Sequence, residues 1–135
     1  SLGIIAALYW AFKLRTSAPE AISLQRSIDL SRADIVDVVD AFERFRDSGD
    51  AEAIADRTLQ RPELNNPNST DPDIESFYIQ LATARRFLQR LDIHLMSAST
   101  TEELESLLAI TDKRAFELNQ SWIKARRAAV RFKRG

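Results

Sequence analysis

The sequence predicts an all-α protein, a bundle of four to five helices with a long C-terminal helical hairpin. Between residue 73 and residue 134 the chain contains neither proline nor glycine, whereas a sheet protein needs a turn roughly every 8 to 12 residues. Apolar residues in the same stretch recur three and four positions apart, which places them on one helical face. The length of 135 residues, with 44% hydrophobic and 29% charged positions, is typical of one globular domain.

The first element is an uncharged apolar run over residues 2–12. It is too short to span a membrane, which takes about 20 apolar residues, so it indicates either an interfacial anchor or a buried terminal helix. Further apolar residues upstream of Ser1 would make it the end of a longer span. Its expected membrane or partner contacts are Ile4, Ile5, Leu8, Tyr9, Trp10 and Phe12.

Two basic residues, Lys13 and Arg15, follow this run and indicate its cytoplasmic side. We therefore expect a protein that is membrane-associated on the cytoplasmic side, or cytoplasmic. The chain divides into an apolar N-terminal helix over residues 1–15 and a helical bundle domain over residues 16–135.

Capping signals predict the next two helices. A capping box with Pro19 in its first turn predicts a helix over residues 18–29 that pauses near Asp29, and Ser31 has the position and type of an N-cap for a second helix. Ser48, Gly49 and Asp50 are expected to end that helix, with Gly49 free to take the left-handed conformation. Asp50 can then cap a short helix that reaches about Gln60.

The C-terminal hairpin is predicted over residues 73–132, after one long loop rich in proline and asparagine. Thr100 and Glu103 form a capping box between its two arms. Leu88 and Leu118 are expected to share one core. The second arm is longer than the first, so its turns past about Ala125 are expected to project beyond the body.

The charge is unevenly distributed: residues 113–135 carry eight basic side chains and one acid, although the whole chain has a net charge of -1. Four cations align on one helical stripe and are the expected contact for an anionic surface: Lys124, Arg127, Arg131 and Arg134. One alternative is a solvated face. Another is pairing, within the fold or across two chains, with the acidic residues Asp34, Asp37, Asp40 and Asp47. We expect a protein partner or a homo-oligomer and allow an anionic membrane surface, whereas the acidic remainder of the chain disfavours nucleic acid.

Composition excludes much catalytic chemistry. The chain has no cysteine, only three glycines and a single histidine, which removes thiolate chemistry, glycine-rich phosphate loops and two-histidine metal sites. His94 is expected to be a hydrogen-bonded structural residue. We therefore predict no catalytic residues, no metal and no cofactor.

The preferred function is a non-catalytic helical interaction module, an accessory subunit that binds partners through its apolar N-terminal helix and its basic C-terminal helix. One alternative is a ligand-sensing bundle with an aromatic-lined cavity. The other is a metal-dependent hydrolase, which would require the carboxylates of Asp34, Asp37 and Glu105 to converge.

Overall fold

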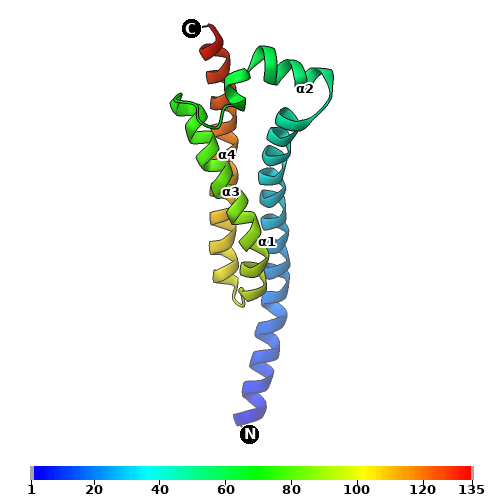
Figure 1. The fold of residues 1–135 in the computed structure, drawn as a ribbon. Helices are drawn as coiled ribbons and strands as arrows, with labels where there is room; N and C mark the ends of the chain where they lie inside the picture. The colour runs from blue at the N-terminus through cyan, green and yellow to red at the C-terminus, as the bar shows by residue number, and fades with distance from the viewer. Residues whose placement is uncertain (1, 135) are drawn as a thin grey trace.

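The computed structural model describes the backbone of residues 2–134 and the side chains of residues 18–133. This part of the chain is almost entirely helical and contains no strand, which confirms the all-α class. Three long helices make up the body (Figure 1). The elements are α1 (Leu2–Asp47), α2 (Ala51–Ala55), the π-helix η1 (Asp56–Gln60), the 3-10 helix η2 (Pro62–Asn65), α3 (Pro72–Ser97) and α4 (Thr101–Arg134).

Helix α1 is one continuous helix of 46 residues, so the predicted pause near Asp29 is wrong. Pro19 lies inside the helix, and Ser31 donates a side-chain hydrogen bond to Asp112 of α4 instead of capping a new helix. Ile28 and Ile35, on either side of the expected break, are fully buried. Burial along α4 therefore outweighs the local capping signals, as tertiary context often does.

Helix α3 begins after an N-cap at Asp71, and α4 begins at the capping box that the sequence predicts. The Asp71 carboxylate accepts hydrogen bonds from the backbone N–H groups of Asp73 and Ile74, at 2.9 and 3.2 Å. Thr100 Oγ1 accepts from the Glu103 N–H at 3.1 Å, while the Glu103 carboxylate accepts from the Ser99 N–H at 2.8 Å. Between them, three residues reverse the chain, so the two helices run antiparallel and side by side (Figure 1).

The core has two parts along the bundle. The larger part is built around an aromatic cluster in which the Phe42 ring lies 5.4 Å from that of Phe77 and 6.2 Å from that of Trp122. Leu118 is fully buried in this part, and Leu88 is half-buried against it. The smaller part, nearer the α3–α4 turn, contains Ile28, Leu91, Leu104 and Leu107.

The segment between α1 and α3 covers the C-terminal half of α4. Leu64 is fully buried, and the Tyr78 hydroxyl donates to its carbonyl oxygen at 2.7 Å. Ala125, Ala128 and Ala129 are fully buried as well, so the expected projection of α4 past Ala125 is wrong. The N-terminal part of α1 is the segment that extends beyond the body (Figure 1).

The end of α1 is stabilised by an arginine. Helix α1 ends at Asp47, directly before the predicted stop, but the described glycines include none with a positive φ, so Gly49 does not use the left-handed conformation. The Arg57 guanidinium instead donates to the carbonyl oxygens of Ser48, at 2.6 Å, and Phe45, at 3.4 Å. A left-handed residue after a helix normally helps to satisfy the last carbonyl groups. Because the Arg57 guanidinium satisfies two of them here, the end of α1 does not need Gly49 in that conformation.

Candidate interaction surfaces

The apolar run forms the beginning of α1. Ile4, Ile5, Leu8, Tyr9, Trp10 and Phe12 all fall in this helix, although their side chains lie outside the described residues. In Figure 1 this part of α1 passes the α3–α4 turn and continues with no other described element alongside it. Among the described residues, no helix contains an apolar stretch long enough to cross a membrane.

The predicted basic stripe lies on the outer side of α4. Lys124, Arg127 and Arg131 are exposed, whereas the side chain of Arg134 lies outside the described residues. An Arg131 guanidinium nitrogen lies 3.1 Å from a carboxylate oxygen of Asp73, at the start of α3. This pair is open to solvent, since the two side chains are 62% and 42% exposed.

Within the part of the chain that the structure describes, no ion pair joins this stripe to the acidic residues of α1. Among the described side chains, the alternative of pairing with Asp34, Asp37, Asp40 or Asp47 inside the fold is therefore not observed. The contact of Ser31 with Asp112 places Asp34 well before the basic end of α4, which separates this carboxylate from the stripe. Asp47 instead pairs with its neighbour Arg46 at 2.8 Å.

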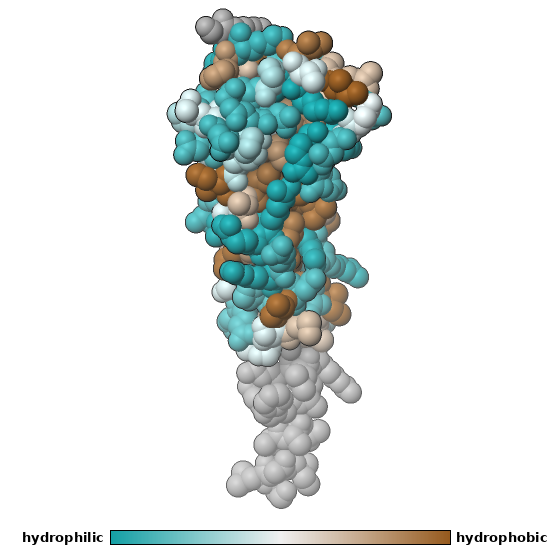
Figure 2. Space-filling model, in the orientation of Figure 1, coloured by the Kyte–Doolittle hydropathy of each residue, from teal (hydrophilic) through white to brown (hydrophobic). Residues whose placement is uncertain are grey.

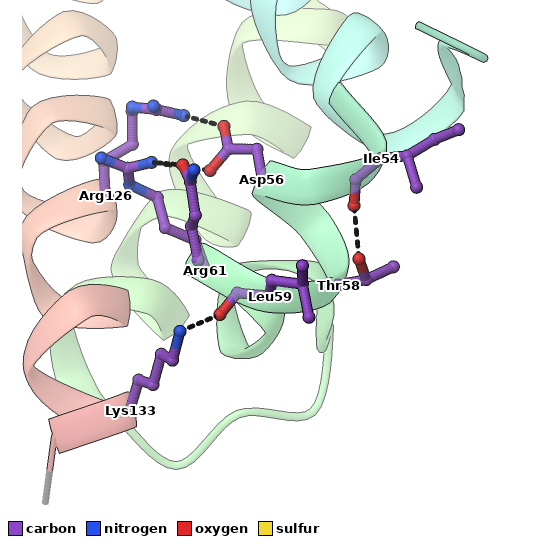
Figure 3. A network of polar contacts seen from close by, with 8 residues as sticks. Ile54, Asp56, Thr58, Leu59, Arg61, Arg126 and Lys133 are labelled. Carbon is purple, nitrogen blue, oxygen red and sulfur yellow. Dashed lines mark hydrogen bonds and ion pairs between the residues drawn. The ribbon is translucent and has the colours of Figure 1, made fainter. Parts of the chain in front are cut away.

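A network of charges joins α4 to the π-helix (Figure 3). The Asp56 carboxylate lies 2.6 Å from the Arg61 guanidinium and 3.2 Å from that of Arg126, so this carboxylate forms ion pairs with two arginines. The guanidinium of Arg126 also lies 5.1 Å from the centre of the Trp122 ring, a cation–π distance. Nearby, the Lys133 ammonium donates to the carbonyl oxygen of Leu59.

Two open grooves run along the same side of α4. The first, of about 650 Å³, lies between α1 and α4 and is lined by the carboxylate-bearing residues Asp34, Asp37 and Asp112 and by apolar residues that include Phe116. The second, of about 560 Å³, is lined by Arg61, Trp122, Ile123, Arg126, Arg127, Val130 and Arg131. Trp122 lines both grooves, so an acidic groove and a basic groove meet at this residue.

The residues weighed for catalysis do not come together. Asp34 and Asp37 line the acidic groove, but Glu105 is not among its lining residues. The described histidine, aspartate and glutamate side chains form no group of three or more that could hold a metal ion.

His94 is exposed, so the expectation of a hydrogen-bonded structural histidine is wrong. It lines two open grooves of about 360 and 380 Å³ between α3 and α4. The reason is that His94 lies outside the buried stripe of α3, whose core member in this region is Leu91.

The face of the body seen in Figure 2 is mainly hydrophilic, with scattered hydrophobic residues.

Sequence reasoning missed the charge network around Asp56. The signal was weak, since Asp56 lies inside the short predicted helix, Arg61 follows that helix, and both are far from Arg126 in the chain. It also did not predict that Phe116 is 65% exposed. Phe116 lies outside the apolar stripe of α4, and that spacing is the signal that could have identified it.

No family model matches the chain, and no match was found among curated proteins or solved structures. The function is therefore inferred from the residues of the chain and their geometry.

Proposed function

We propose that this protein is a non-catalytic helical interaction module, held at a membrane or an apolar partner surface by the beginning of α1. The observation that carries the proposal is that the uncharged residues 2–12 belong to the same helix as the bundle and extend beyond it (Figure 1). A surface that binds these residues would hold the bundle at a defined distance. This arrangement suits an accessory subunit that presents its body to other proteins.

The basic surface of α4 lies far from this apolar segment. The rings of Phe42 and Trp122 are 6.2 Å apart, so the cations after Trp122 lie beyond the level of residue 42 in α1. The rise of 1.5 Å per residue puts them about 45 Å or more from residue 12. Charges in solution are screened over about 10 Å at 0.1 M salt, so a membrane that binds residues 2–12 exerts little attraction on Arg127.

It follows that the two surfaces serve different partners. The apolar segment suits lipid or an apolar groove, whereas the basic surface suits an acidic protein surface. This division supports a role as an adaptor, and the open grooves favour contact with macromolecules over capture of a small ligand, for which enclosed pockets are typical.

The test is binding of the full chain to uncharged phosphatidylcholine vesicles, measured by co-sedimentation and by the blue shift of tryptophan fluorescence. The parent chain should bind, since Trp10 lies within the segment. A variant with Ile5→Asp and Leu8→Asp should bind at least tenfold more weakly, because two charges would have to enter an apolar environment.

The matched control introduces the same two charges at the other end of the molecule. Leu59 and Phe132 are 64% and 49% exposed, so Leu59→Asp with Phe132→Asp should leave vesicle binding unchanged. Equal binding by the two double variants, or no binding by the parent chain, would overturn the anchoring role.

A further inference from the structure

The side of α4 that carries the two grooves has opposite charges at its two ends. The acidic end bears three carboxylates, from Asp34, Asp37 and Asp112. At the basic end, four arginines line the second groove: Arg61, Arg126, Arg127 and Arg131. These arginines meet two carboxylates, those of Asp56 and Asp73, so two positive charges stay unmatched among the described residues.

An apolar line runs between these charges. Phe116, Ile123 and Val130 are seven residues apart along α4, a spacing that keeps them on one line of the helix and suits packing against another helix. Phe116 is 65% exposed, and the other two are half-buried. An exposed aromatic side chain in an apolar line between charged groups is typical of a protein contact surface.

We infer that a second copy of this chain packs antiparallel on this side of α4, with a two-fold axis near Trp122. Asp112 lies ten residues before Trp122, and Arg131 lies nine residues after it. Reversing one copy about Trp122 therefore brings the acidic groove of each copy opposite the basic groove of the other. A parallel pair would instead oppose like charges.

In this two-fold pair, each acidic groove faces a basic groove, so the charges of all four grooves are matched. In a two-fold interface the same surface serves each partner, so every acid–base contact occurs twice and no complementary end stays open to extend a fibre. The facing stretch from Asp112 to Arg131 is about 28 Å long at 1.5 Å per residue. Phe116 and Ile123 of each copy lose contact with water inside it, which supplies the apolar part of the association.

The inference deepens the proposed interaction role, because it names a second copy of the chain as the partner of the grooves. Only its consequence for membrane or partner attachment rests on the proposed anchoring by residues 2–12. The N-terminal part of α1 lies at one end of the molecule (Figure 1). In an antiparallel pair, the two apolar segments therefore lie at opposite ends. Such a pair would link two apolar surfaces.

The test is a charge swap in the full chain, followed by sedimentation at low salt. One variant carries Asp34→Lys and Asp37→Lys, and the other carries Arg127→Glu and Arg131→Glu. Each variant alone opposes like charges across the two-fold axis and should be monomeric at concentrations where the parent chain is dimeric. An equimolar mixture should regain the dimer mass as a one-to-one pair, because every contact then joins opposite charges.

The matched control makes the same charge change outside the grooves. Glu52 and Glu105 are exposed, so Glu52→Lys with Glu105→Lys should leave the dimer intact. Circular dichroism of each variant verifies that the helices persist. A monomeric parent chain, dimers of either charge-swap variant alone, or a mixture that stays monomeric would overturn the inference, and the last result would also be expected if the grooves hold a helix of another protein.

The test separates this inference from the anchoring role. Association through residues 2–12 would affect all of the variants equally, since none of them changes that segment. A chain that binds vesicles but stays monomeric refutes the pair alone. A chain that dimerises but does not bind vesicles refutes the anchor alone.

Discussion

The ion pair between Arg32 and Asp92 joins α1 to α3 at the level of single residues. The Arg32 guanidinium donates twice to the Asp92 carboxylate, at 2.7 and 3.3 Å. These hydrogen bonds, together with the positive charge, hold the pKa of Asp92 below its ordinary value of 3.8. Because both side chains are partly or largely open to solvent, the pair contributes little to the free energy of unfolding.

The pKa of Asp92 should respond to removal of its partner. In a carbon-detected NMR titration, its carboxylate should titrate below pH 3.8, and Arg32→Gln should raise this pKa towards the ordinary value. A lowered native pKa means that the small contribution to stability is present above the unfolded pKa and is lost as the pH falls through the native one. A titration that is identical in parent and variant would contradict the pair.

At the level of the helices, α1 shows how packing overrides local signals. Pro19 and Ser31 carry the sequence features of helix starts, yet both lie inside one helix in the structure. An N-cap contributes about 1 kcal/mol, whereas each fully buried Ile or Leu side chain contributes about 1.5 to 3 kcal/mol. The buried Ile28 and Ile35 therefore favour continuation through the region between them.

The continuity of α1 can be measured directly, because the chain has no native cysteine to interfere with labelling. Arg26 and Arg44 are exposed and lie 18 residues, or five turns, apart, so they point in the same direction. Spin labels on Arg26→Cys and Arg44→Cys should give one narrow distance near 27 Å. A broad or markedly shorter distribution would indicate a break near Asp29, as the capping signals alone suggest.

At the level of the whole molecule, stability depends on how the helices share the core. Helix α4 packs against both α1 and α3, and its residue Leu118 is fully buried in the larger part of the core. Leu88 lies at the edge of the same part and is only half-buried. Leu88 and Leu118 both follow the helical spacing of apolar residues in the sequence, yet the structure buries them to different extents.

Alanine substitutions should reveal this difference in chemical denaturation. Leu118→Ala should lower the free energy of unfolding by about 2 to 5 kcal/mol, and Leu88→Ala should lower it by less, because less apolar surface is lost from the core. Ile93 is 66% exposed, so Ile93→Ala provides the control and should have almost no effect. Equal denaturation midpoints for the Leu118 and Ile93 variants would contradict the packing described above.

The all-α class, the capping box at Thr100 and the burial of Leu118 could all be predicted from the sequence. Each depends on neighbours within a few positions or on helical periodicity, which are local properties of the chain. The continuity of α1, the cover over Ala125, the charges around Asp56 and the exposure of Phe116 required the tertiary structure. These features depend on which helices meet and in what register, and contacts such as Ser31 with Asp112 or Asp56 with Arg126 join residues too far apart in the chain for local spacing to specify.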